Sequence, residues 1–195
     1  MKFPLVVYDN FYERPDEIRE YALSLDYNQA GHYPGKRSER IEDLDYEMFE
    51  MMSLKFLSLV VEPENGVDST VLTQFQKIDP MGRGLIHKDG MDSVIAGVVY
   101  LDPWPNLGSG TSFYRPNLGL QPTEKSLFYA YEDYNSQFET TTIVKNVYNR
   151  CILYDAQTWH SHTRVEEPRL TQVFFVNALA VKERITSERV LSYVI

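Results

Sequence analysis

Residues 93–101 read Ser-Val-Ile-Ala-Gly-Val-Val-Tyr-Leu and carry no charged side chain. β-Branched and aromatic residues favour extended strands, and a short apolar run between turn residues is typical of a strand buried in a sheet. The same character returns at 170–178, Leu-Thr-Gln-Val-Phe-Phe-Val-Asn-Ala. These two stretches predict the centre of a β-sheet.

Short strands of this kind follow one another from residue 69 onward, separated by glycine, proline, asparagine or aspartate. They lie at 71–77, 84–87, 93–101, 111–114, 141–146, 150–155, 160–165 and 170–178. Eight short strands predict a jelly roll or sandwich. The pattern breaks between 114 and 141, which indicates an insertion. Its tyrosine-rich part, 128–134, is either a lid or a segment packed on the sheet.

The first 68 residues favour helices instead. Pro15 opens a helix over about 15–25, with two carboxylates in its first turn. Phe49, Met52 and Phe56 recur at helical spacing and predict a second helix. The polar stretch 28–40 between them is interpreted as a loop, and its basic part, 35–40, as solvated. The prediction is one mainly β domain over 1–195, with helical support over 1–68 and a β core over about 69–180.

Composition excludes several classes of protein. Among 195 residues, Asp and Glu outnumber Lys and Arg by 28 to 19, and a net charge of -9 disfavours nucleic acid as a partner. Cys151 is the single cysteine, which rules out an intrachain disulfide and favours a reducing compartment. Apolar runs are too short to span a bilayer. We therefore expect a soluble, cytoplasmic protein without membrane contact; the sequence does not indicate its oligomeric state.

The chemistry-bearing motif is His87-Lys88-Asp89. Side chains two apart on a strand share a face, so His87 and Asp89 can reach one metal. An H-x-D pair alone is weak evidence, but His160 follows a predicted strand and completes two imidazoles and a carboxylate, a set typical of non-haem iron. His162 shares the face of His160 and is the alternative ligand. A lone cysteine argues against a closed zinc site.

Arg169 follows a predicted reversal at 166–168 and shares a strand face with Thr171. A guanidinium on an apolar strand needs an anion, and its planar fork suits a carboxylate. The pattern therefore indicates a site for an anionic cosubstrate beside the metal. The alternative is an ion pair with Glu166 or Glu167.

Over about residues 71–178 these features resemble the Fe(II)- and 2-oxoglutarate-dependent oxygenases, in their prolyl-hydroxylase-like branch. The segment 99–102, Val-Tyr-Leu-Asp, is similar to that branch's Tyr-Leu-Asn motif. Residues 108–114, Gly-Ser-Gly-Thr-Ser-Phe-Tyr, are similar to its Gly-Gly segment, and Asn149-Arg150 to its Asp/Asn-Arg strand opening. Two departures are the serine between the two glycines and a stretch, 115–139, without a counterpart.

The resemblance implies a double-stranded β-helix in which His87, Asp89 and His160 hold Fe(II). Arg169 would bind the distal carboxylate of 2-oxoglutarate, helped by Tyr100 and Thr171. The implied reaction hydroxylates a C–H bond and releases succinate and CO2. The substrate, small molecule or peptide, is not indicated. The alternatives are a catalytically silent jelly-roll module with a binding or structural role, or a cupin-like metalloenzyme that does not use 2-oxoglutarate.

Overall fold

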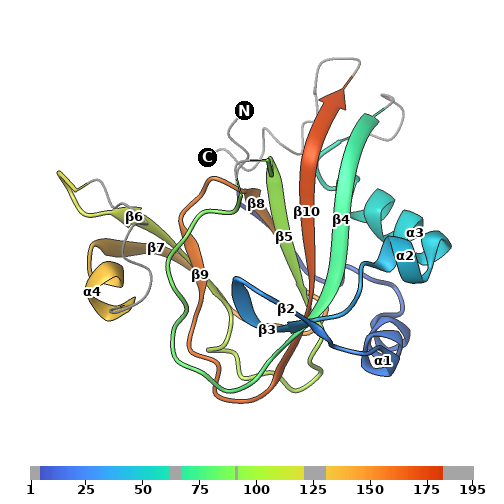
Figure 1. The fold of residues 1–195 in the computed structure, drawn as a ribbon, viewed down its shortest axis with the longest axis horizontal. Helices are drawn as coiled ribbons and strands as arrows, with labels where there is room; N and C mark the ends of the chain where they lie inside the picture. Colours follow the sequence, from blue (N-terminus) through green and yellow to red (C-terminus); the bar gives the residue numbers. More distant parts are fainter. Residues whose placement is uncertain (1–4, 62–66, 91, 121–130, 182–195) are drawn as a thin grey trace.

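The structure, a computed structural model, describes residues 5–61, 67–90, 92–120 and 131–181 (Figure 1). In these ranges the strands are β1 (Val6–Tyr8), β2 (Gln29–Gly31), β3 (Tyr33–Arg37), β4 (Val67–Ile78), β5 (Ile95–Tyr100), β6 (Thr111–Pro116), β7 (Phe138–Val144), β8 (Cys151–Asp155), β9 (His160–His162) and β10 (Arg169–Val181). They form a seven-stranded sheet in the order β1-β8-β5-β10-β4-β3-β2 and a three-stranded sheet in the order β7-β6-β9.

The two sheets pack against each other through apolar side chains of β5, β6 and β8. Tyr100, Phe113, Ile152 and Tyr154 are buried there in one cluster. All strand pairs in both sheets are antiparallel. The predicted fold class, a mainly β jelly roll with N-terminal helices, is confirmed.

Three helices, α1 (Pro15–Ser24), α2 (Ile41–Leu44) and α3 (Tyr46–Leu57), lie beside the large sheet on the side away from the small sheet (Figure 1). α1 begins at the predicted Pro15, with Asp16 and Glu17 in its first turn, and buries Ile18 and Ala22. The predicted first helix is therefore confirmed.

α3 covers the centre of the large sheet. Its N-terminus is capped by Asp45, whose carboxylate accepts a hydrogen bond from the backbone N–H of Met48 at 2.9 Å. Phe56 stacks on Phe174 of β10, with ring centroids 4.3 Å apart and an interplanar angle of 5°. Gly97 of β5 makes room for this ring, because a Cβ there would lie 2.4 Å from Phe56 Cε2. This packing fixes β5 and β10 from behind, so their opposite faces stay available for a site.

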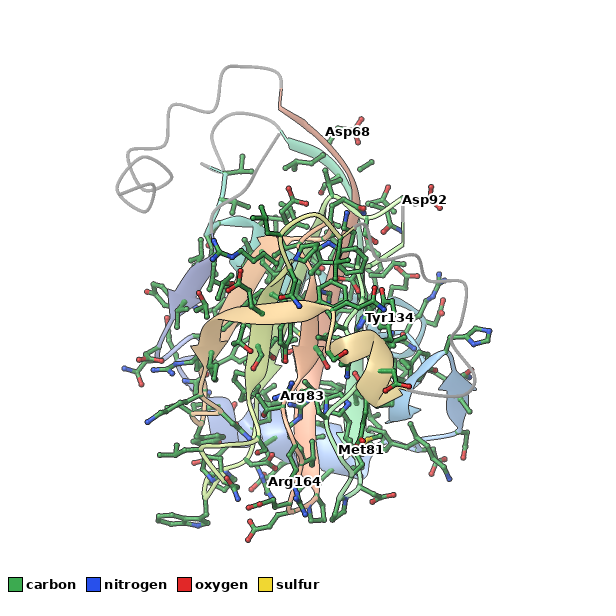
Figure 2. All side chains as sticks on the ribbon, turned by 90° about the vertical axis from the view of Figure 1, so that its left-hand side faces the viewer. Asp68, Met81, Arg83, Asp92, Tyr134 and Arg164 are labelled. Carbon is green, nitrogen blue, oxygen red and sulfur yellow. The ribbon has the colours of Figure 1, made fainter. Side chains whose placement is uncertain are left out.

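β4 and β10 form the longest strand pair and run the length of the molecule. Their register extends from Val181 opposite Val67 to Arg169 opposite Ile78. Figure 2 shows Asp68 towards one end of the molecule and Met81 and Arg164 towards the other. β10 therefore begins at the end where the chain turns back after β9.

The predicted loop over 28–40 is wrong, because β2 and β3 form a hairpin there that extends the large sheet. Side-chain amides of β4 hold it: Gln76 Nε2 donates to the Pro34 carbonyl at 2.5 Å and Gln74 Nε2 to the Ser38 carbonyl at 2.8 Å. Gly35 has φ 72° and a Cβ there would meet the Lys77 carbonyl, so glycine is required. Proline and glycine signalled a turn, yet both fit this short strand, which lies next to the edge strand β2.

The predicted strand 84–87 is also not formed as a strand. Two single bridges, His87 to His160 and Met81 to Val165, and a hydrogen bond from the Gly84 N–H to the His162 carbonyl at 3.3 Å join this segment to the chain around β9. Between the two bridges, the side chain of Asn135 binds the backbone in place of a neighbouring strand. Its Oδ1 accepts from the Ile86 N–H at 3.0 Å, and its Nδ2 donates to the Gly84 carbonyl at 3.1 Å. The segment is held beside β9 without a continuous ladder.

The predicted insertion contains α4 (Tyr131–Asn135), which follows β6 and precedes β7. β6 and β7 pair from Thr111 opposite Val144 to Pro116 opposite Phe138, so the framework extends further into this region than predicted. Part of the predicted lid, 128–130, lies outside the described residues. Cys151 is buried and unpaired. Among the described residues, no helix has both the length and the apolar character needed to cross a membrane.

Candidate metal centre

His87, Asp89 and His160 come together between the two sheets. One potential ligand atom from each lies within 4.8 Å of the others. His160 Nε2 is 3.6 Å from Asp89 Oδ2, and His87 Nε2 is 3.9 Å from Asp89 Oδ1. The backbone fixes this arrangement, because His87 and His160 exchange both backbone hydrogen bonds and the Asp89 N–H donates to the Ala156 carbonyl at 2.9 Å.

Both imidazoles are oriented by their second nitrogen. His87 Nδ1 lies 2.9 Å from the Leu85 carbonyl, and His160 Nδ1 lies 2.9 Å from the Thr158 carbonyl. A carbonyl oxygen only accepts, so each neutral ring carries its proton on Nδ1 and keeps a lone pair on Nε2. The two lone pairs face Asp89, as in histidines that bind metals.

Electrostatics at the centre also fit a cation. Burial raises the pKa of Asp89 to about 6, against the lowering effect of His87 and of Arg37 of β3. Asp89 Oδ2 is buried without a hydrogen-bond partner. Burial and the neighbouring His87 lower the pKa of His160 to about 3, so that imidazole stays neutral. Two imidazoles and one carboxylate are a donor set suited to ferrous iron with coordination positions left open.

The centre is asymmetric in its access to solvent. The side chain of His87 is 40% exposed, whereas that of His160 is 7% exposed and that of Asp89 is 11% exposed. Tyr154 and Phe113 cover the inner side, with ring centroids 4.7 Å and 6.4 Å from that of His160. The centre is therefore reached from the side of His87.

Arg169 lies at the start of β10 and is buried. Its Nη1 donates to the carbonyls of Ser109 and Gly110 at 2.9 Å and 3.0 Å, while its Nε is buried without a hydrogen-bond partner. In the part of the chain that the structure describes, the guanidinium pairs with no carboxylate, and Glu166 instead accepts from Asn106. The alternative ion pair with Glu166 or Glu167 is therefore not observed.

Tyr100 and Thr171 lie beside Arg169 on the inner face of the large sheet. They stand opposite each other in the β5–β10 register. The Tyr100 hydroxyl forms a hydrogen bond of 2.8 Å with Thr111 Oγ1 of β6, and Thr171 Oγ1 is buried without a partner. A buried guanidinium nitrogen and a buried hydroxyl without partners indicate a place for an acceptor that both can contact.

This group and the metal group are neighbours along β6. Phe113 stands opposite His160, and Thr111, which contacts Tyr100, stands opposite His162. Two residues along a strand span roughly 7 Å. The distance between the two groups therefore suits a short dicarboxylate.

His162 shares the inner face of β9 with His160, as predicted, but is not one of the three residues that come together. Its Nδ1 lies 2.7 Å from the Thr163 carbonyl, and its Nε2 lies next to Gly84. Burial lowers its pKa to about 4. The geometry favours His160 over His162 as the ligand.

Two residues of the site were not predicted. Tyr154 was assigned only to a strand, although alternation along β8 places it on the inner face. Arg37 was interpreted as part of a solvated loop; it is partly buried, and its Nε is inaccessible. The basic run around Arg37 hid the alternation of β3.

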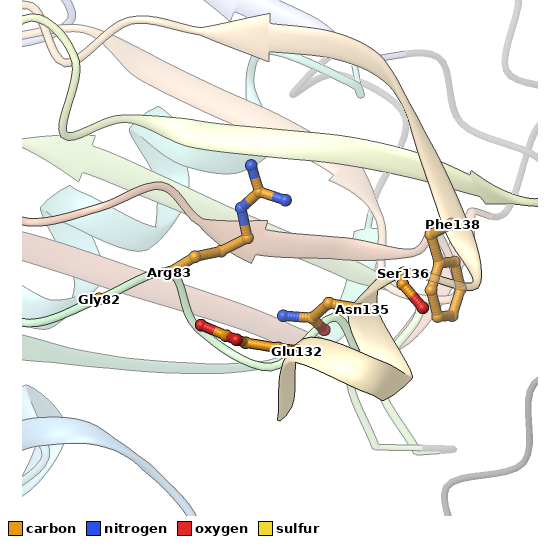
Figure 3. A pocket seen from close by; sticks show the side chains of 6 residues that line it. All are labelled: Gly82, Arg83, Glu132, Asn135, Ser136 and Phe138. Carbon is orange, nitrogen blue, oxygen red and sulfur yellow. The ribbon is translucent and has the colours of Figure 1, made fainter. Parts of the chain in front are cut away.

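A separate hollow of about 550 Å³ lies beside α4 (Figure 3). Its lining includes Arg83, which precedes the metal ligands in the chain, and Glu132 and Asn135 of α4. None of its lining residues belongs to the metal group or to the Arg169 group, so it is distinct from the predicted site.

A family model, described as a family of unknown function (DUF6445), matches residues 1–126. The chain belongs to this family. The matched region includes His87 and Asp89 and ends before His160 and Arg169. No curated protein matches the sequence.

Solved structures with a similar fold include a prolyl-4-hydroxylase of Pseudomonas putida, with a TM-score of 0.51 and 12% identity over 90% of this chain and 92% of that chain. HygX of Streptomyces hygroscopicus, with nickel and 2-oxoglutarate bound, has a TM-score of 0.60 and 15% identity, over 90% of this chain and 83% of that chain. A prolyl hydroxylase of Trichoplax adhaerens, in complex with a hypoxia inducible factor peptide, has a TM-score of 0.59 and 14% identity, over 97% of this chain and 87% of that chain. At these identities the similarity shows the fold. The predicted resemblance to prolyl-hydroxylase-like oxygenases is confirmed at that level.

Proposed function

We propose that this member of DUF6445 is an Fe(II)- and 2-oxoglutarate-dependent oxygenase that hydroxylates a C–H bond of its substrate. The observation that carries the proposal is the convergence of His87, Asp89 and His160 within 4.8 Å, in the same cavity wall as the buried guanidinium of Arg169 and its neighbour Tyr100. Neither group alone would distinguish this chemistry from a structural metal or a buried ion pair.

His87 and His160 would hold iron through Nε2, and Asp89 through its carboxylate. Their backbone-bonded Nδ1 atoms keep the ligand nitrogens aimed at one point. When bound, iron and 2-oxoglutarate supply the oxidising chemistry: 2-oxoglutarate, O2 and R–H become succinate, CO2 and R–OH. The residues of this chain position the reactants for it.

Arg169 would bind the distal carboxylate of 2-oxoglutarate. Its buried Nε and the Thr171 hydroxyl have unused hydrogen-bonding capacity, and the Tyr100 hydroxyl can donate to the carboxylate while accepting from Thr111. Charge-assisted bonds in a buried site are stronger than neutral ones. This set would therefore fix one end of the cosubstrate and direct its other end to the metal.

Phe113 and Tyr154 would exclude water from the inner side of the centre. Their rings cover His160 and leave the side of His87 for the substrate. An apolar wall limits unproductive reactions of the bound oxidant with solvent. The proposal that the centre binds iron and 2-oxoglutarate is supported by the similar fold of HygX, which binds iron, nickel and 2-oxoglutarate in crystals.

The test is anaerobic addition of Fe(II) and 2-oxoglutarate to the metal-free protein. A weak visible charge-transfer absorption from the chelated keto acid is expected in the parent protein and absent from Asp89→Ala. Metal binding without this band in a folded protein would favour a cupin-like metalloenzyme, and loss of both would favour a silent jelly-roll module. Succinate formation with a substrate panel then measures turnover.

A further inference from the structure

Arg37 is a cation of the inner face for which the proposed function has no role. Alternation along β3 and the register to β4 place it opposite Gln76, which itself stands opposite Thr171 of β10. Residues that stand opposite each other in a sheet point to the same side. Arg37 therefore points to the side of the large sheet that carries Thr171 and Tyr100.

Two aromatic rings hold the guanidinium of Arg37. Its Cζ lies 3.9 Å from the ring centroid of Tyr33 and 5.3 Å from that of Phe175. Stacking on rings uses the flat faces of a guanidinium and leaves the N–H groups at its edge for an acceptor. This arrangement orients the side chain without satisfying its donors.

The donors of Arg37 remain unused within the described chain. Nε is buried without a hydrogen-bond partner, and no described carboxylate forms an ion pair with this guanidinium. Burial lowers its pKa, and the opposing effects of Tyr33, Asp89 and Tyr154 do not cancel this electrostatic cost of a partly buried cation. An arginine in such a place is typical of a site that is completed by an anionic ligand.

Contacts connect Arg37 to the metal centre along a path that does not include Arg169. Phe175, one of the two rings that hold Arg37, packs against the buried cluster that contains Tyr154. Tyr154 lies against His160, with ring centroids 4.7 Å apart. The cavity therefore has cations on two different strands, Arg169 at the start of β10 and Arg37 on β3.

We propose that Arg37 binds a carboxylate of the substrate and so holds a neighbouring C–H bond next to the metal centre. The inference rests on the proposed function and names its substrate class, an organic acid. A single planar guanidinium suits one carboxylate bidentately, and the strongly acidic chain, with a net charge of -9, offers little further positive charge for a phosphate.

The experiment is calorimetry on protein loaded with Ni(II) and 2-oxoglutarate, which binds ligands without turnover. The probes are two matched pairs, benzoate with benzamide and hexanoate with hexanamide. Each acid is expected to bind about tenfold more tightly than its amide, the size of one charge-assisted pair. Equal binding of acid and amide, or binding of neither, in the parent protein overturns the proposal.

Three variants assign the effect to Arg37. Arg37→Gln should abolish the preference for the acid, and Arg37→Lys should retain part of it. Lys36→Gln removes the same charge from the exposed neighbour on β3 and should change nothing. A preference that survives Arg37→Gln overturns the assignment.

Two further measurements separate the possible failures. Arg37→Gln should leave the affinity for 2-oxoglutarate unchanged; a tenfold loss would make Arg37 a cosubstrate residue and contradict the proposal. The acids are also titrated into protein with Ni(II) alone. An acid preference there, together with no charge-transfer band, would reject the oxygenase function and keep the carboxylate site.

Discussion

His160 and His162 occupy the same face of β9, yet only His160 directs a ring nitrogen at Asp89. His160→Ala should therefore abolish tight metal binding, because one of three ligands is lost. His162→Ala should keep the metal affinity within a few-fold of the parent. Calorimetric titration with Ni(II) measures both, and circular dichroism checks the fold. Equal loss in the two variants would contradict the ligand assignment.

The ionisation of Asp89 predicts how metal binding depends on pH. Its pKa is raised to about 6 by burial in the metal-free protein, while that of His160 is lowered to about 3. Protons compete with metal for this carboxylate only below about pH 6, so affinity should decrease as the pH falls from 6 to 5. Each unit below the pKa weakens binding by up to roughly tenfold through this group. Ni(II) titrations at pH 5, 6, 7 and 8 test it, and a constant affinity from 8 to 5 would indicate an ordinary carboxyl.

Arg169 has unused hydrogen-bonding capacity at the cosubstrate end of the cavity. Arg169→Ala should leave Ni(II) affinity unchanged and weaken 2-oxoglutarate binding by about 1.5–3 kcal/mol, the value of a charge-assisted hydrogen bond. Arg164→Ala, an exposed cation before β10, is the control and should have no effect. Parallel loss of metal and cosubstrate in Arg169→Ala would mean that this residue only supports the fold.

At the level of elements, the connection into β6 depends on one of its two glycines. A Cβ on Gly110 would lie 1.9 Å from the Val144 carbonyl, whereas a Cβ on Gly108 would meet only the Asn106 side chain at 3.1 Å. Gly110→Ala must displace β6 from β7, and the Gly110 carbonyl that accepts from Arg169 moves with it. We expect a destabilisation of about 1–3 kcal/mol together with weaker 2-oxoglutarate binding.

Gly108→Ala serves as the matched variant and should stay close to the parent in both respects. Urea unfolding gives the stability of each protein, and calorimetry gives the cosubstrate affinity. If the two alanine variants behaved alike, the close approach at Gly110 would not constrain this connection.

Elements with a strong apolar pattern were predictable from the sequence. β10 begins one residue before its predicted start, at Arg169, because burial on both faces leaves a continuous apolar run. β3 was missed because Pro34 and Gly35 signal turns and because its partners, Gln74 and Gln76, lie far away in the sequence. The segment before His87 was overpredicted for the same reason, since the amide of Asn135 interrupts its ladder from a distance.

The candidate site was predictable where local spacing carries it. His87 and Asp89 are two residues apart, and the sequence named His160 as the third ligand with His162 as the alternative. The geometry that favours His160 is not local in the sequence: its Nε2 lies 3.6 Å from Asp89 Oδ2, whereas His162 stands opposite Thr111 in the register of β9 against β6. Arg37 had no local signal at all, because only the pairing of β3 with β4 turns it towards the cavity.

At the scale of the molecule, both sheets contribute to the site. The metal ligands come from β9 of the small sheet and the segment bridged to it, whereas Arg169 and Tyr100 belong to the large sheet. A cosubstrate that chelates the metal and pairs with Arg169 would connect the two sheets. We propose that residues 1–195 form a single domain, since β1 near the start of the chain and β10 near its end belong to the same sheet.

This coupling predicts a cooperative effect on thermal stability. A ligand at 100 times its dissociation constant stabilises the native state by about 2.7 kcal/mol, which for a chain of this size raises the Tm by roughly 5–10 °C. Ni(II) and 2-oxoglutarate together should raise the Tm by more than the sum of their separate shifts, in one transition, because each completes the binding site of the other. In Asp89→Ala, the Tm shift caused by 2-oxoglutarate should be the same with and without Ni(II). Additive shifts, or two separate transitions, would show that the sheets respond independently and that metal and cosubstrate do not meet between them.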